Sequence, residues 1–168
     1  MAFTVSVTID RSIEVACDPA TAFALVSDVP KSVSHLPKVE RLTDLGDGTY
    51  RLETQKIGIE KYFVQTVYAS RYTNDPKKRT VTWTPVRGEG NATVGGSWEV
   101  SELASGKTRL RLVNKGEMEL PFPGLVKSLV SPFVKREYDD LIDRYLANLT
   151  RTLESGAAAK PGKKGGKR

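Results

Sequence analysis

Two side chains that could do chemistry occur once each in the chain, His35 and Cys17. A single histidine excludes a His-paired metal site, and a single cysteine excludes an internal disulfide or a cysteine-built zinc site. Histidine titrates near neutrality, so His35 is the natural general base if one exists, with a surface histidine as the alternative. No spacing indicates a nucleophile, and we expect Cys17 to be buried and inert. We therefore expect no metal, no cofactor and no catalytic residue of these types.

Arg11 and Asn114 are polar residues that an alternating pattern places on the inward faces of strands. Burying a guanidinium is costly unless it is paired, so an inward Arg11 needs a carboxylate partner or the anionic head of a ligand. The alternative is that the strand bulges or frays there and Arg11 reaches solvent.

Several large side chains with a polar atom are predicted to line an internal wall together with Leu112: Tyr62, Tyr68, Trp83 and Trp98. Such side chains suit a wall that contacts an apolar ligand while an O–H or N–H finds a partner. The alternative at each position is an ordinary core residue. Phe63 competes with Tyr62 and Tyr68 for the inward face of their strand.

Hydrophobic periodicity predicts the elements that position these residues. Apolar residues at odd positions from Phe3 to Val15 predict a strand with one buried face. Asp18 and Pro19 begin a short helix over 19–27 with Phe23 inward, and 31–36 is predicted as a second short helix. Six further strands are predicted at 39–45, 49–57, 60–73, 79–85, 93–103 and 107–119. A bulge is predicted at Gly95-Gly96.

A long amphipathic helix follows, with Ser131 as its cap and Pro132 at its first position. Its apolar stripe runs to Leu153 and includes three residues that we expect to contact a ligand: Val134, Tyr138 and Leu141. The carboxylates of 137–143 are predicted to lie on its polar face as ion-pair partners of nearby arginines. The apolar, proline-interrupted segment 120–130 suits a lid over a cavity mouth, which could also dip into a membrane surface.

These elements predict an α+β fold in which a curved seven-stranded antiparallel sheet wraps around a long C-terminal helix, with two short helices after the first strand. A cavity between sheet and helix is the default place for a ligand.

The chain has 168 residues and a net charge of +6, which fits one domain, predicted over 1–154. Five of the 26 basic residues lie in 155–168, which contains no acidic residue, so residues 1–154 are close to neutral. This composition predicts a disordered basic tail, while a nucleic-acid-binding face on the domain is not supported. The first residues lack the pattern of a secretory signal, so we expect a cytoplasmic protein.

Three stretches resemble the START-related helix-grip superfamily, which includes polyketide cyclase/dehydrase-like, lipid-transport-like and birch-pollen-allergen-like proteins. They are IEVACDPATAFALVSDVPKSVSHLPKVERL, VGGSWEVSELASGKTRLRL and KREYDDLIDRYLANLTRTLE. The resemblance implies a hydrophobic ligand held between sheet and helix, and some members of the superfamily cyclise polyketides.

The leading hypothesis is binding or transport of a hydrophobic small molecule, such as a lipid, quinone, sterol or polyketide, without catalysis. One alternative is an enzyme of the polyketide aromatase/cyclase type that uses pocket tyrosines or Arg11 to polarise a carbonyl. Another is association of the tail with an anionic membrane or, less favoured, with nucleic acid. The set of predicted ligand-binding residues is Arg11, Phe23, Tyr62, Tyr68, Trp83, Trp98, Leu112, Asn114, Val134, Tyr138 and Leu141.

Overall fold

The computed structural model describes residues 2–156. Its strands are β1 (Phe3–Val15), β2 (Val39–Gly46), β3 (Thr49–Thr54), β4 (Ile57–Ile59), β5 (Tyr62–Val64), β6 (Val67–Asp75), β7 (Thr80–Val86), β8 (Ala92–Glu102) and β9 (Thr108–Leu120). Its helices are α1 (Pro19–Val26), α2 (Val29–Val33), the short 3-10 helix η1 (Gly124–Val126) and α3 (Lys127–Glu154).

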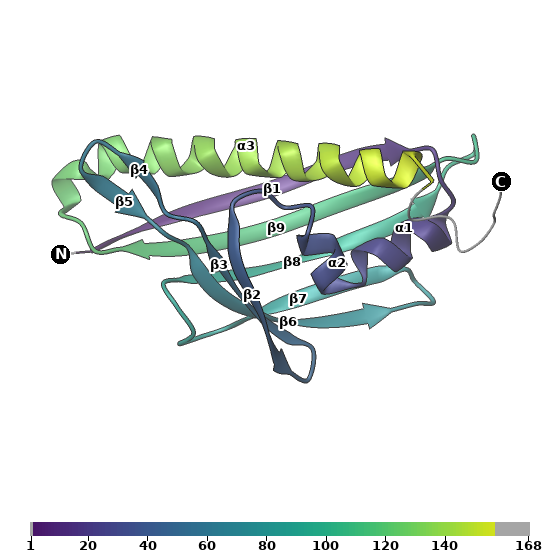
Figure 1. Cartoon of the computed structure of the whole chain (residues 1–168), viewed down its shortest axis with the longest axis horizontal. Coiled ribbons are helices and arrows are strands. Elements are labelled where there is room, and N and C mark those ends of the chain that lie inside the picture. Colours follow the sequence, from purple (N-terminus) through teal and green to yellow (C-terminus); the bar gives the residue numbers. More distant parts are fainter. Residues whose placement is uncertain (1, 157–168) are drawn as a thin grey trace.

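Seven strands form one antiparallel sheet in the order β1-β9-β8-β7-β6-β3-β2, and β4 and β5 form a separate hairpin. The sheet curves beneath α3, while α1 and α2 lie towards the C-terminal half of that helix (Figure 1). The β4–β5 hairpin leaves the sheet and approaches the N-terminal end of α3 (Figure 1). The predicted α+β helix-grip arrangement is therefore confirmed.

The pairing of the longest strands corrects two details of the predicted sheet. β1 pairs with β9 without a register shift from Phe3 to Val15, so there is no bulge at Arg11, which lies opposite Leu112. The β8–β9 ladder also runs through Gly95 and Gly96 without a shift, so the predicted bulge there is wrong. Gly96 has another role, since a Cβ at this position would lie 2.9 Å from the ring of Trp83.

Both short helices begin at an aspartate that accepts a hydrogen bond from the first turn. Asp18 accepts from the backbone N–H of Thr21 at 2.7 Å, and Asp28 accepts from that of Lys31 at 3.1 Å. These side chains satisfy N–H groups that have no partner within the helix. Because Asp28 caps and proline is favoured in a first turn, α2 begins at Val29 rather than at the predicted position 31.

Two predicted strands are each divided in the structure. The predicted strand 49–57 contains β3 and the start of β4, and 60–73 contains β5 and most of β6. At the division, Thr54 Oγ1 accepts a hydrogen bond from the Thr66 N–H at 2.9 Å, and the Thr54 N–H donates to the Thr66 carbonyl at 2.9 Å. These bonds close the base of the β4–β5 hairpin.

Helix α3 begins at Lys127, earlier than predicted, so Pro132 lies inside the helix rather than at its first position. The Ser131 hydroxyl does not cap the helix; it is buried without a hydrogen-bond partner in the described part of the chain. Val130 of the extra turn belongs to a buried cluster that also contains Phe3 and Leu120. Burial of these apolar side chains outweighs the interior proline.

Helix α3 ends at Glu154, where the predicted domain ends. The tail predicted over 155–168 lies outside the described residues from residue 157 onwards, so its disorder remains a prediction.

Candidate functional site

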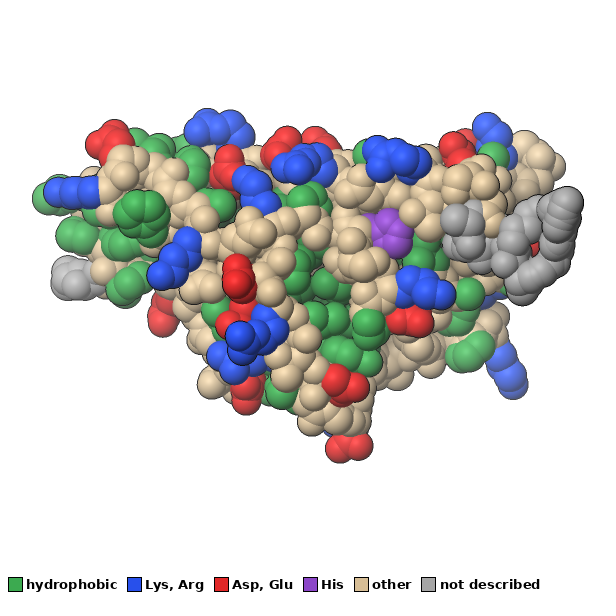
Figure 2. Space-filling view, viewed as in Figure 1, with side chains coloured by type: hydrophobic (Ala, Val, Ile, Leu, Met, Phe, Trp, Pro, Cys, Tyr) green, Lys and Arg blue, Asp and Glu red, His purple; other side chains and the backbone are tan. Residues whose placement is uncertain are grey.

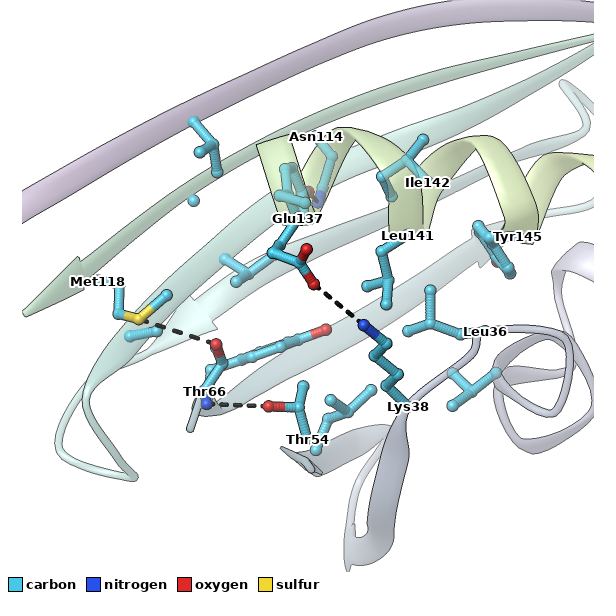
Figure 3. Close-up of a pocket in the computed structure, with 18 of the residues that line it drawn as sticks. Leu36, Lys38, Thr54, Thr66, Asn114, Met118, Glu137, Leu141, Ile142 and Tyr145 are labelled. Atoms are coloured by element: carbon cyan, nitrogen blue, oxygen red, sulfur yellow. Dashed lines mark hydrogen bonds and ion pairs between the residues drawn. The ribbon is translucent and has the colours of Figure 1, made fainter. Parts of the chain in front are cut away.

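A cavity of about 170 Å³ lies between the concave face of the sheet, α2 and the middle of α3. Figure 3 shows side chains from these elements pointing into it, with Leu36, Leu141 and Ile142 supplying apolar walls. Of the predicted ligand-binding residues, those that line the cavity are Tyr68, Trp83, Trp98, Leu112, Asn114, Val134, Tyr138 and Leu141. An engineered apolar cavity of about 150 Å³ accommodates benzene, so this cavity has room for at least one ring.

A chain of hydrogen bonds crosses one wall of the cavity. Asn114 accepts a hydrogen bond from the Trp83 ring N–H at 2.9 Å and donates from its amide to the Tyr138 hydroxyl. Burial raises the pKa of Tyr138 to about 12, against the opposing effect of the bond from Asn114. Asn114 therefore links a strand β7 side chain to helix α3, and this inward amide is satisfied by the protein itself.

Three further tyrosines line the same cavity. Tyr145 shares a hydrogen bond of 2.5 Å with the buried Ser32, which joins α3 to α2. Burial raises the pKa of Tyr145 to about 12, and it also raises the pKa values of Tyr68 and Tyr72 above the ordinary tyrosine value. Within residues 2–156, the hydroxyls of Tyr68 and Tyr72 make no hydrogen bond with another side chain or with the backbone. Both hydroxyls stay protonated at neutral pH, so each can donate to a ligand.

One ion pair stands at the edge of this apolar cavity. Lys38 Nζ lies 3.0 Å from Glu137 Oε1, and the two side chains are 35% and 30% exposed. Figure 3 shows the pair spanning from the segment before β2 to helix α3. Lys38 has a left-handed backbone with a φ of 63°, which is uncommon outside glycine. Strained backbone of this kind is concentrated at functional sites.

The sequence reasoning missed both members of this pair. Glu137 was grouped with the polar face of α3, although it lies three residues after Val134 and four before Leu141, which is the spacing of one helix face. That spacing was a usable signal. No comparable signal marked Lys38, because its position depends on how the loop after α2 folds back.

Arg11, Phe23 and Tyr62 lie outside the cavity, contrary to the prediction. Arg11 forms ion pairs with Asp139 at 3.5 Å and with Asp143, so its charge is neutralised by α3 rather than by a ligand. The sequence analysis predicted that these carboxylates pair with arginines of α3 itself. Among the described residues, the exposed Arg144 is the one arginine of α3 that forms an ion pair, with Asp140 at 3.6 Å.

Phe23 packs against the main core cluster from α1. Tyr62 belongs to the β4–β5 hairpin and contacts Phe122 edge-on, with ring centroids 5.1 Å apart. Segment 120–130 does not border the cavity either, so it is not a lid over the mouth.

His35 connects α2 to the end of α3 and does not line the cavity. Its Nδ1 lies 2.9 Å from the Lys31 carbonyl, which can only accept, and its Nε2 lies 2.8 Å from the Thr152 hydroxyl. Nδ1 therefore carries the proton and Nε2 accepts from Thr152. With both ring nitrogens engaged away from the cavity, His35 is a structural residue rather than a general base.

Cys17 is expected to react slowly with thiol reagents. Burial, followed by the charges of Asp18 and Glu154, raises the pKa of its thiol from 9.0 to about 11. The thiolate is the reactive species, so the reaction with Ellman's reagent at pH 8 should be about 100-fold slower than that of the urea-unfolded chain. Equal rates in the folded and unfolded protein would contradict this environment.

Within residues 2–156, no group of three or more His, Cys, Asp or Glu side chains is arranged to hold a metal ion. None of the described helices combines the length and the hydropathy needed to cross a bilayer.

A sheet that grips one long helix around an apolar cavity defines the class of helix-grip proteins. The sequence profile of the polyketide cyclase / dehydrase and lipid transport family matches residues 6–154, and the chain belongs to this family. A search of curated protein sequences gave no significant match.

Solved structures share the fold at low sequence identity. The Zhui aromatase/cyclase from Streptomyces sp. R1128 is 16% identical, with a TM-score of 0.65 over 94% of this chain and 99% of the other. A START superfamily protein from Mycobacterium smegmatis is 18% identical, with a TM-score of 0.63 over 88% and 97%. A norcoclaurine synthase variant from Thalictrum flavum is 14% identical, with a TM-score of 0.60 over 92% and 98%.

Proposed function

We propose that this chain binds a hydrophobic small molecule that carries at least one oxygen acceptor, such as a quinone, polyketide, sterol or lipid. The observation that carries the proposal is the apolar cavity between the sheet and α3, in which Tyr68 and Tyr72 offer hydroxyls that make no hydrogen bond to any described residue. Apolar walls supply most of the binding free energy, and a few polar atoms set the orientation. The family description, which names lipid transport and polyketide cyclases, supports the same class of ligand.

The Lys38–Glu137 pair restricts where a polar end of the ligand can lie. The cavity interior beside Trp98 and Leu112 is apolar, whereas both charges stand at its edge. A ligand would place its ring or chain inside and keep a polar end close to this pair, where charge remains partly hydrated. The eight cavity-lining residues predicted from the sequence are proposed as its contacts, and Arg11, Phe23 and Tyr62 are not.

The test is extraction of the purified protein with organic solvent, followed by mass spectrometry of what is released. We expect a small set of hydrophobic compounds in near-stoichiometric amount from the wild type. Leu141→Trp should fill the cavity and reduce the released amount at least about tenfold, because the ring occupies volume that the ligand needs. Leu45→Trp is the matched control, since Leu45 is 45% exposed and does not line the cavity.

Two results would overturn the proposal. One is a wild-type extract that matches the solvent blank, with no binding of quinones or fatty acids added in titration. The other is release that falls equally in Leu141→Trp and Leu45→Trp, because binding would then not depend on the cavity.

A second candidate function is an enzyme of the aromatase/cyclase type. The sequence offered no clear acid–base pair, but Glu137 and Lys38 line the same cavity as the tyrosines. In an intramolecular aldol closure, the Glu137 carboxylate would take a proton from a carbon between two carbonyls. That carbon would attack another carbonyl carbon of the same chain, whose oxygen would accept a hydrogen bond from Tyr68. The oxygen would then take the proton held by Glu137, which regenerates the carboxylate. Three of the structural neighbours are described as aromatase/cyclases, which supports considering this chemistry.

Lys38→Met and Glu137→Gln separate the two candidates. Each should change the free energy of unfolding by less than about 1 kcal/mol, since the pair is one-third exposed. If the protein is a carrier, both variants keep the ligand with less than about tenfold weaker binding. If it is a cyclase, turnover of a poly-β-ketone substrate falls at least about 100-fold while binding persists. Arg144→Met and Asp140→Asn remove an exposed pair on the same helix and should change neither binding nor turnover.

A further inference from the structure

Two of the three large apolar side chains that are exposed in the described chain lie at one end of the molecule. Leu125 in η1 is 92% exposed and Phe63 in β5 is 65% exposed. The hairpin and the segment before α3 are in contact there, through Tyr62 and Phe122. We call the β4–β5 hairpin and residues 120–126 together the apolar tip. Figure 2 shows its apolar side chains gathered at the end where the N-terminus of α3 lies in Figure 1.

Basic residues surround the apolar tip. Segments 55–64 and 120–136 contain a single acidic residue, Glu60, and the following basic residues: Lys56, Lys61, Lys127, Lys135 and Arg136. All except Lys61 lie beside rather than within the hairpin and η1, and all are exposed. Glu117 and Glu119 lie nearby on the outer face of β9. An exposed apolar surface with a basic rim is the arrangement that binds an anionic lipid interface.

The hairpin of the apolar tip also borders the cavity. Its Ile57 and Val64 side chains line the cavity together with Val134 of α3. The hairpin pairs only with itself and makes no ladder with the seven-stranded sheet, so its movement would break no strand pairing of that sheet. Its base is held by the bonds between Thr54 and Thr66.

We propose that the apolar tip docks on an anionic membrane surface, with Phe63 and Leu125 inserted below the headgroups and the surrounding lysines on the phosphates. The β4–β5 hairpin then lies between the bilayer and the cavity, as the gate through which the ligand passes. The passage of ligand rests on the function proposed above, whereas docking does not. The proposal does not rest on residues 155–168, whose sequence offers basic charge without large apolar side chains.

The test places an environment-sensitive fluorophore at single positions of the full chain. In a Cys17→Ser background, NBD is attached at Leu125→Cys, at Phe63→Cys or at Leu45→Cys. Vesicles of phosphatidylcholine with 30% phosphatidylglycerol are added, with pure phosphatidylcholine vesicles for comparison. We expect a blue shift and at least about a twofold rise in emission at positions 125 and 63 with the anionic vesicles, and no change at position 45. Vesicle binding without a shift at 125 and 63 would assign the binding to the tail and overturn the proposal.

A charge reversal provides an independent measurement by vesicle co-sedimentation. Lys61→Glu with Lys127→Glu should weaken binding about tenfold or more, because each basic residue near the surface contributes to attraction. Lys77→Glu with Lys107→Glu makes the same change in net charge at exposed turns elsewhere and should have little effect. Equal losses in both pairs would show that net charge alone governs binding, which contradicts docking through the tip. Emission changes that depend on protein concentration without vesicles would indicate self-association and also overturn it.

The two proposals fail separately. If Leu141→Trp loses its ligand and position 125 shows no shift with vesicles, the cavity binds ligand without membrane docking. If the NBD emission at position 125 shifts with vesicles and the solvent extract matches the blank, the tip docks on membranes but the proposed ligand binding is wrong.

Discussion

Gly96→Ala is expected to lower the free energy of unfolding by about 3 kcal/mol, the upper range for overpacking of a well-ordered site. An added Cβ would overlap the backbone carbonyl of Val113 and lie 2.9 Å from both Asn114 Oδ1 and the ring of Trp83. Backbone atoms cannot move aside as a flexible side-chain end can. Relief therefore requires β8 to shift, and with it the hydrogen bonds from Trp83 to Asn114 and from Asn114 to Tyr138.

Urea unfolding followed by circular dichroism measures this loss, and the near-ultraviolet signal of Trp83 should change as well. Gly116→Ala is the matched control on β9, because its nearest neighbour is a methyl group of Val7 at 3.4 Å, an ordinary contact. That variant should change the free energy of unfolding by less than about 1 kcal/mol. If both variants have the same free energy of unfolding, the strands around Gly96 accommodate the added methyl group and the prediction is wrong.

Alkaline conditions are expected to destabilise the protein steeply between pH 10 and pH 12. The unfolded chain releases tyrosine protons near pH 10, whereas burial raises the pKa of Tyr138 and Tyr145 to about 12 and also raises those of Tyr68 and Tyr72. In this range the folded state holds more protons than the unfolded state, so the free energy of unfolding falls as pH rises. At pH 11, one unit above the unfolded pKa, Tyr138 and Tyr145 each contribute about 1.4 kcal/mol to this loss of stability, and Tyr68 and Tyr72 add to the loss in the same direction.

Urea midpoints at pH 8, 10, 10.5 and 11 measure this slope, and absorbance at 295 nm shows when tyrosinate forms. The absorbance change of these four residues should coincide with unfolding rather than precede it. Tyr72→Phe removes one titrating group without breaking a hydrogen bond to another described residue, so its decline with pH should be shallower by about 1.4 kcal/mol at pH 11. An unchanged slope in Tyr72→Phe would contradict the burial of this hydroxyl.

Local sequence patterns determined most of the elements of this protein. The odd-position apolar residues of β1 and the three- and four-residue spacing along α3 are periodicities that only one buried face can satisfy. Asp18 caps α1 as predicted because the cap is made within three residues of sequence. Eight of the predicted ligand contacts line the cavity for the same reason, since the face of a residue follows from its position in a regular element.

The predictions that were wrong concern residues whose position depends on a contact with a distant part of the chain. Pro132 lies inside α3 because burial of Val130 against Phe3 and Leu120 extends the helix past the local signal. Arg11 is on an inward-facing position of β1 but is long enough to reach Asp143 beyond the edge of the core. The pairings of Arg11 with Asp143 and of Phe3 with Val130 join residues more than 100 positions apart, and no periodicity in the sequence displays them.

Periodicity in the sequence therefore predicts the fold class, the face of each long element and an apolar interior with tyrosines. The charges at the cavity edge follow from packing instead, because Lys38 meets Glu137 through the fold of the loop after α2 and the rotation of α3. Packing also decided that Phe63 and Leu125 share one exposed end of the molecule, since the hairpin and the segment before the 3-10 helix, far apart in the chain, are in contact there. Periodicity assigns residues to faces, whereas the contacts between faces follow from how whole elements pack.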